Sequence, residues 1–134
     1  MAMNTGRVAN LEARLDHEKL DVYQLALTFC AWTQDLIDEL DKKNRYRGRH
    51  IKDHLDRASL SILLNTAEGN GKRQKQIRAK FFDDARGSAT ECSACLDSLV
   101  AIRCCPGGRV KEGKEMLLRI ASMLTKLVQL FSGE

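Results

Sequence analysis

The sequence has little of what builds β-folds, membrane spans or disulfide frameworks. It contains one proline, Pro106, and nine glycines among 134 residues, so long uninterrupted helices are favoured over a many-turned β-fold. Its apolar runs are far too short to cross a bilayer, and its N-terminus has no apolar stretch like that of a secretory signal. Five cysteines, an odd number without framework spacing, fit a reducing compartment. We therefore expect a single all-α domain in the cytoplasm.

Catalytic motifs are also missing from the sequence. It has no phosphate-cradling glycine loop, no nucleophile elbow and no HExxH-type metal motif. Asp83 and Asp84 are adjacent, so on a helix their carboxylates diverge by about 100° instead of converging on a substrate. We therefore expect neither enzymatic activity nor a cofactor.

A zinc site is the one metal hypothesis that the residue spacing offers. His50 and His54 lie one helical turn apart, and a helical hairpin would bring Cys92 and Cys95 to about the same height. However, Cys92 falls in the middle of an apolar stripe, whereas His50 points away from the core face of its own helix. We therefore expect core-filling cysteines, solvated histidines and no bound metal.

Helix-breaking residues divide the chain into four segments with short connections. Interruptions at 44–48, 69–71 and 105–108 leave helices that we expect near 16–43, 49–68, 73–104 and 109–131. Short links between long helices make successive helices antiparallel, which predicts an up-down-up-down four-helix bundle over residues 16–134. Residues 1–15 are polar and irregular, and we expect this N-terminal segment to be partly disordered.

The first predicted helix has two apolar stripes instead of one. The first stripe comprises Tyr23, Leu27, Cys30 and Ile37. The second stripe comprises Val22, Leu25, Phe29, Trp32 and Leu36. Because a bundle helix ordinarily needs one apolar face, the second stripe predicts the interface of a homo-oligomer. The alternative is that the N-terminal segment folds back over this stripe.

The third predicted helix carries a charge among apolar neighbours. Its core stripe comprises Ile77, Phe81, Ala85, Ser88, Cys92, Leu96 and Leu99. Arg86 lies on a flanking apolar face, where an arginine normally pairs with a carboxylate. Helical register makes Asp53 or Asp56 its candidate partner within the chain. Gly87, the next residue, is expected to permit close helix approach.

Two polar residues near the end of the second predicted helix also need partners. Glu68 faces the negative end of its helix dipole, which is locally unfavourable for a carboxylate. It could accept hydrogen bonds from the first N–H groups of the third helix, or pair with Arg73. Asn65 lies one turn earlier and could bridge the same junction. We therefore expect Asn65 and Glu68 to fix the hinge between the two helices.

The polar residues around the second connection form two motifs. The chain reads Ser61-Ile62-x-x-Asn65-x-Ala67-Glu68-Gly69 before the connection and Phe81-x-x-x-Ala85-Arg86-Gly87-Ser88-x-x-Glu91 after it. Together they resemble the four-helix bundle family encoded in intervening sequences of bacterial 23S rRNA genes, with a match from about Leu20 to Leu130. Thr66 departs from the isoleucine that is usual in that family. The motif residues to which we assign structural roles are Asn65, Glu68, Gly69, Arg86, Gly87, Ser88 and Glu91.

The resemblance implies a cytosolic four-helix bundle that assembles as a ring-like homo-oligomer, commonly a pentamer, with no established enzymatic activity. Accessory proteins of diversity-generating retroelements look similar in architecture, and those bind nucleic acid and a reverse transcriptase through a basic surface. This second likeness is a functional analogy only. It makes RNA or DNA, and a reverse transcriptase or another protein, the candidate partners of this chain.

Basic residues gather at two of the predicted connections. Those near the first are Lys42, Lys43, Arg45, Arg47, Arg49 and Lys52, with Tyr46 and His50 among them and with Arg109 and Lys111 expected to join them. Those near the second are Lys72, Arg73, Lys75, Arg78 and Lys80. The candidates for nucleic-acid binding are Arg45, Arg47, Arg49, Lys52, Lys72, Arg73 and Lys75. Without a groove-reading motif, binding should be led by phosphate contacts. The net charge is only +4, and the alternative is a protein-binding oligomeric scaffold with no nucleic-acid contact.

Overall fold

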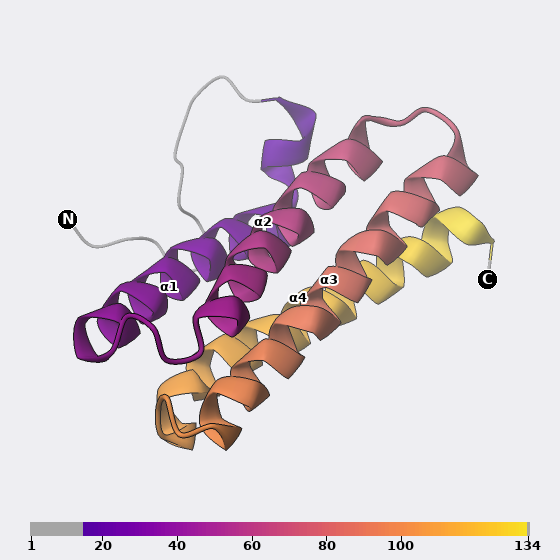
Figure 1. Ribbon diagram of the computed structural model, residues 1–134. Helices are drawn as coiled ribbons and strands as arrows, with labels where there is room; N and C mark the ends of the chain where they lie inside the picture. Colours follow the sequence, from indigo (N-terminus) through magenta and orange to yellow (C-terminus); the bar gives the residue numbers. More distant parts are fainter. Residues whose placement is uncertain (1–14, 134) are drawn as a thin grey trace.

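A computed structural model describes residues 15–133 and shows four long helices (Figure 1). A 3₁₀ turn, η1 (Asp16–Lys19), precedes α1 (Asp21–Lys43), α2 (Arg49–Gly71), α3 (Lys75–Ala101) and α4 (Gly107–Ser132). Each helix packs against two neighbours, in the order α1, α2, α3, α4 and back to α1. No β-strand occurs in the described range. The structure confirms the all-α four-helix bundle expected from the sequence.

The connections are distributed over the two ends of the bundle. The α1–α2 connection (44–48) and the α3–α4 connection (102–106) lie together, and we call this the double-loop end (Figure 1). The α2–α3 connection (72–74) lies at the opposite end, near the C-terminus. Gly48 has a φ of +67° and sits so close to the other loop that a Cβ atom would lie 3.0 Å from Cys104 Sγ. Glycine therefore suits this position both by conformation and by space.

The helix bounds differ from the expected ones for identifiable reasons. The chain straightens at Leu20, so a separate 3₁₀ turn replaces the first turn expected for α1. α2 runs through Gly69 to Gly71, because Gly69 is buried inside the helix instead of ending it. A Cβ atom there would lie 3.0 Å from the Phe82 ring, so this glycine lets α2 and α3 approach closely. Pro106 caps α4, which begins two residues earlier than expected.

The second apolar stripe of α1 was expected to be exposed and to form an oligomer interface. This expectation is wrong, because the stripe faces the core of its own chain. Val22, Leu25, Phe29 and Leu36 are buried within the single bundle. Trp32 is partly buried and stacks on Phe29, with 5.8 Å between the ring centroids. The other stripe is the less buried one. Periodicity had correctly shown two apolar stripes, and both are needed because α1 packs against both α2 and α4.

The core stripe of α3 is rotated relative to the expected one. Phe82, not Phe81, is fully buried, and Ile77 is exposed. Ala85, Cys92 and the leucines at 96 and 99 lie in the core as expected. A Cβ atom at Gly87 would meet nothing within 4 Å, so this glycine does not serve close packing within the described part of the chain.

The predicted N-terminal segment, residues 1–15, lies outside the described residues except for Leu15. From that residue to Gly133, no helix is both long and apolar enough to cross a membrane.

Candidate nucleic-acid interface

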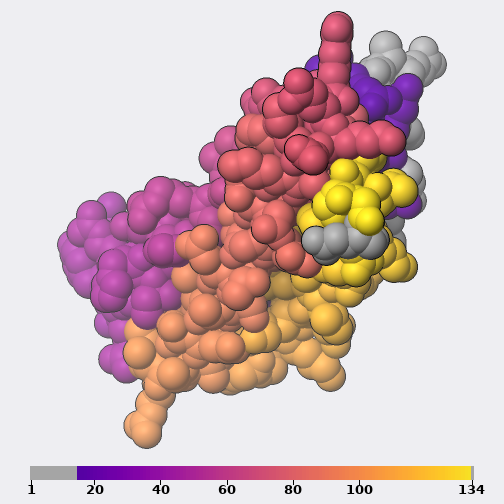
Figure 2. Space-filling view, turned by 90° about the vertical axis from the view of Figure 1, so that its right-hand side faces the viewer, coloured from indigo at the N-terminus to yellow at the C-terminus, as the bar shows by residue number. Residues whose placement is uncertain are grey.

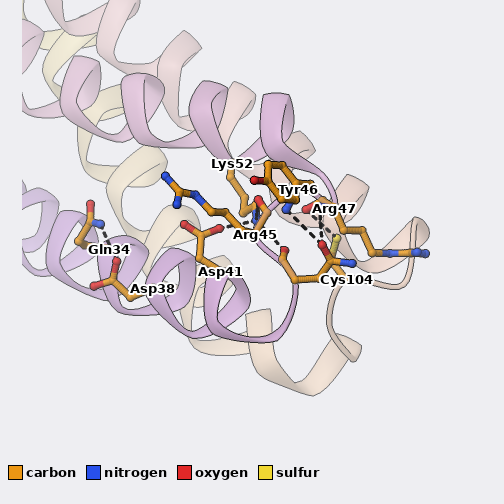
Figure 3. Close-up of polar contacts among 9 residues, drawn as sticks. Gln34, Asp38, Asp41, Arg45, Tyr46, Arg47, Lys52 and Cys104 are labelled. Carbon is orange, nitrogen blue, oxygen red and sulfur yellow. Dashed lines mark hydrogen bonds and ion pairs between the residues drawn. The ribbon is translucent and has the colours of Figure 1, made fainter.

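The α1–α2 connection is shaped by one asparagine and one glycine. Asn44 Oδ1 accepts hydrogen bonds from the backbone N–H groups of Tyr46 and Arg47, at 3.1 and 3.2 Å. Such local side-chain bonds favour a turn over a continuing helix. Gly48 then takes the left-handed conformation and caps α2. The turn therefore places Arg45, Tyr46 and Arg47 on the outside, and Tyr46 is 72% exposed (Figure 3).

Lys52 was expected to contact nucleic acid. This prediction is wrong, because the residue is buried beneath this connection. Only 3% of its side chain is exposed. Its ammonium group binds Asp41 and donates to the backbone oxygens of Asn44 at 3.3 Å and Arg45 at 3.1 Å (Figure 3). A buried ammonium with three acceptors is a structural clamp. Lys52 therefore holds the loop that presents the neighbouring cations.

The two connections of the double-loop end are joined by Arg47 and Cys104. The Arg47 guanidinium donates to the backbone oxygen of Ile102, and Cys104 Sγ lies 3.7 Å from the backbone oxygen of Arg47. Arg47 thus has a role in holding the loops together, although it remains at the surface. The contact also brings Arg103 beside the α1–α2 connection.

Besides Arg47, five exposed cations share this end of the molecule. They are Lys42, Lys43, Arg45, Arg49 and Arg103. Within residues 15–133 none of them forms an ion pair. Arg103 was missed in the sequence because the third helix was expected to continue to 104. It instead follows the end of α3 with a φ of +63°, and the nearby Cys-Cys-Pro run was the signal for an earlier helix end.

Arg109 is not available at this end, although it was expected to join the cluster. Its Nε atom lies 2.9 Å from Glu39 Oε2, and its guanidinium covers the Trp32 ring at 5.5 Å from the centroid. Both contacts tie α4 to α1. Arg109 therefore stabilises the bundle, while Lys111 remains exposed.

The opposite end has fewer available cations. Lys72 pairs with Glu68 at 3.3 Å, while Arg73 and Lys75 are exposed. Arg78 is structural, because its guanidinium donates to the backbone oxygens of Asn70 and Lys72 and lies 4.4 Å from the centroid of the Phe131 ring. The double-loop end is therefore the stronger candidate surface.

Several motif residues have partners other than the expected ones. Arg86 binds Asp83 and Thr125, so the expectation of Asp53 or Asp56 is wrong. Arg86 faces α4 because it lies on the side of α3 away from α2. Glu68 is exposed and pairs with Lys72 instead of Arg73 or the helix N–H groups.

The remaining motif residues lie along the seam between α2 and α3. Asn65 donates to the backbone and hydroxyl oxygens of Ser61, both at 3.0 Å, so it does not bridge the hinge. The Ser61 hydroxyl lies 2.9 Å from that of Ser88. Glu91 is exposed and binds His54 at 2.7 Å. These contacts are near the surface, so the motif is only partly explained by packing within one chain.

His50, His54 and Cys95 border one surface pocket, but Cys92 does not join them there. His50 and His54 are exposed, whereas Cys92 and Cys95 are buried. Burial raises the pKa of both thiols, which keeps them protonated at neutral pH. Over the described part of the chain, no three His, Cys, Asp or Glu side chains are grouped as a metal site would require.

The buried clamp leads to a stability prediction. Lys52→Met is expected to lower the free energy of unfolding by about 1–3 kcal/mol, because Asp41 and two loop carbonyls lose their shared donor. Lys43→Met, at an exposed position nearby, should change it by less than about 0.5 kcal/mol. Urea denaturation followed by circular dichroism compares the two. Equal midpoints for both variants would show that the clamp contributes nothing.

Comparisons with known proteins give a consistent picture. A family model described as 23S rRNA-intervening sequence protein matches residues 18–126. Among solved structures, one similar fold is a protein of unknown function from the S23 ribosomal protein family of Bacteroides thetaiotaomicron. It has 16% sequence identity and a TM-score of 0.75, and the alignment covers 81% of this chain and 98% of that one. At this identity the likeness shows the fold alone. No curated protein sequence matches the chain.

Proposed function

We propose that this chain, which belongs to the family of 23S rRNA-intervening sequence proteins, is a non-enzymatic, cytoplasmic homo-oligomer that binds nucleic acid. The observation that carries the proposal is the group of exposed cations at the double-loop end, which have no ion pairs in their own chain over residues 15–133. Unpaired guanidinium and ammonium groups beside an exposed Tyr46 suit phosphate contacts and stacking on an unpaired base. The family resemblance favours a ring of five subunits.

The loop geometry supports binding that is led by phosphate. Lys52 and Asn44 fix the connection, so Arg45 and Arg49 are held on an ordered support. Ordering the support before binding lowers the entropy cost of the contacts. The sequence contains no recognised groove-reading motif, so affinity should depend weakly on base sequence. A ring would place several copies of the surface on one strand, and multivalency would then raise the affinity.

Neutralising the double-loop end is the direct test. A chain with Lys43→Gln, Arg45→Gln and Arg49→Gln should bind mixed-sequence RNA and DNA at least about tenfold more weakly at low salt. The slope of log affinity against log salt should fall by about 2–3 per subunit engaged, since each lost phosphate contact removes roughly one. Fluorescence anisotropy with labelled single- and double-stranded oligonucleotides measures both quantities.

The matched control removes the same charge from the other end. Lys72→Gln, Arg73→Gln and Lys75→Gln change the net charge equally and should weaken binding less. Equal losses would mean that net charge, and not the double-loop end, drives binding. Binding that does not respond to salt, or no measurable binding at all, would contradict the proposal and favour the protein-binding scaffold.

A further inference from the structure

Large apolar side chains are exposed on two separate helices. Leu60 and Leu64 of α2 are 50% and 53% exposed, and Leu118 of α4 is 70% exposed. Figure 2 looks onto the side of the molecule where α3 lies between α2 and α4. The single bundle does not cover these side chains. Leu60 and Leu64 lie one turn apart on α2, and neighbouring exposed apolar side chains commonly mark an interaction site.

The exposed leucine of α4 borders a hollow between α3 and α4. This groove has a volume of about 660 Å³ and is floored by small and apolar residues, among them Ala89, Ser93, Leu117 and Ala121. Lys111 also lines it, and the α3/α4 groove continues past Lys111 toward the start of α4. Its apolar floor suits the exposed face of a helix.

The exposed faces of α2 and α4 carry opposite charges at comparable heights. Both helices begin at the double-loop end (Figure 1). Counted from the first residue of each helix, the matched positions are Asp53 and Lys111 at four residues, Asp56 and Lys114 at seven, Arg57 and Glu115 at eight, Leu60 and Leu118 at eleven, and Glu68 and Lys126 at nineteen. With about 1.5 Å of rise per residue on both helices, equal counts from the same end place these positions at comparable heights along the bundle.

Four of these charges lack a partner in their own chain. Asp53, Arg57, Lys111 and Glu115 form no ion pair with any residue between 15 and 133. Asp53 and Arg57 precede Leu60 on α2, just as Lys111 and Glu115 precede Leu118 on α4. Charges of opposite sign at matched heights would pair if α2 of one copy lay parallel to α4 of another.

We propose that the α2 face, comprising Asp53, Arg57, Leu60 and Leu64, packs into the α3/α4 groove of a second copy of this chain. The inference rests on the proposed homo-oligomer and names the two surfaces that join it. Rotation about an axis along the bundle leaves every height unchanged, so the charge pairs stay in register in a ring. Because the two surfaces differ, the contact is head-to-tail, and repeated rotation can close it into a ring.

Two single-surface variants, which together change three leucines, test the two faces. Leu60→Glu combined with Leu64→Glu should reduce the full-length protein to a monomer, and Leu118→Glu should do the same. All three positions are exposed, so helix content should be unchanged. Leu130→Glu is the control, because Leu130 is an exposed leucine outside both surfaces and should leave the mass unaltered. Light scattering after gel filtration gives the mass, and circular dichroism checks the fold.

Mixing the variants distinguishes a head-to-tail contact from a symmetric one. The α2-face variant keeps an intact groove, and the Leu118→Glu variant keeps an intact α2 face. An equimolar mixture should therefore form a heterodimer of twice the monomer mass and nothing larger. If the two variants remained monomeric when mixed, the pairing of these two surfaces would be overturned.

A charge exchange tests the register. Asp53→Lys should weaken association about tenfold, Lys111→Asp should weaken it equally, and both changes in one chain should restore it. Association that stays weak in the double variant would overturn the register.

Failure here is separable from failure of the proposed function. A wild-type oligomer that survives every variant overturns only this interface, because anisotropy tests nucleic-acid binding independently. A monomeric wild type overturns both this interface and the proposed homo-oligomer.

Discussion

The substitution Phe29→Glu is expected to unfold the protein, and not merely to separate the subunits of an oligomer. Phe29 is fully buried and stacks on Trp32. Loss of its ring costs about 3–5 kcal/mol, and an unpaired buried carboxylate adds further to that cost. Because domains of this kind have a free energy of unfolding of about 5–15 kcal/mol, most of the stability should be lost. Far-UV circular dichroism and urea denaturation would measure the remaining helix content and its midpoint.

Leu130→Glu serves as the control for Phe29→Glu, since it introduces the same charge at an exposed leucine. It should change the free energy of unfolding by less than about 0.5 kcal/mol. A Phe29→Glu chain with the parental helix content and urea midpoint, but with a smaller mass in solution, would contradict the burial of Phe29. Such a result would mean that the α1 stripe containing Phe29 lies at the protein surface.

The number and order of the helices could be predicted because their breakers are local. The connection at 44–48 contains an asparagine and a glycine whose preferences need no tertiary context, and Pro106 cannot continue a helix. The role of Gly69 could not be predicted in this local way. Whether a glycine ends a helix or sits within it depends on what packs against it, and here the Phe82 ring favours the absence of a side chain.

The inward face of α1 could not be chosen from periodicity. The helix contacts two neighbours, so both of its stripes are apolar. Cys30 Sγ lies 3.4 Å from the backbone oxygen of Ser59 on α2, whereas Trp32 packs over Gly113 on α4. Hydrophobic pattern gives the angle between two stripes but not the helix that each one meets.

The position of the basic cluster could be predicted from the sequence, but not which basic residues are exposed in it. Clustering of basic residues identified the double-loop end, yet Lys52 and Arg109 are used internally. A long side chain on the first turns of a helix can point outward or reach back under the preceding loop, and the sequence is the same in both cases. Arg103 depended on where α3 ends, which is set by packing against the other connection.

The exposed leucines of α2 explain why Asn65 and Glu68 were expected to need specific partners. Leu60 and Leu64 give α2 apolar residues on its outer side, so the sequence around the two polar residues is apolar in most directions. The structure places Glu68 at the surface and Asn65 at the seam with α3. An outer face with this composition is typical of a surface that a second chain covers, which agrees with the interface inferred for α2.

The substitution Gly113→Val is expected to have the second largest effect on the free energy of unfolding, because the Trp32 ring packs directly against Gly113. A Cβ atom there would lie 2.3 Å from two ring carbons of Trp32. The ring cannot move freely, since Phe29 stacks on it and the Arg109 guanidinium lies 5.5 Å from its centroid. Ejecting the ring loses its packing, at a cost of about 3 kcal/mol or more. The gain in helix propensity over glycine is well under 1 kcal/mol and does not offset this.

Gly87→Val is the matched variant for Gly113→Val, because Gly87 also lies inside a helix but has no atom within 4 Å of a Cβ position. It should leave the free energy of unfolding unchanged or raise it by a few tenths of a kcal/mol. Trp32 is the only tryptophan in the sequence, so its emission reports the ring directly. Gly113→Val should shift that emission to longer wavelength in the still-folded fraction, as water reaches the indole, while Gly87→Val should not. If Gly113→Val kept the parental emission and urea midpoint, α1 and α4 would have to lie further apart than the close contact at Gly113 requires.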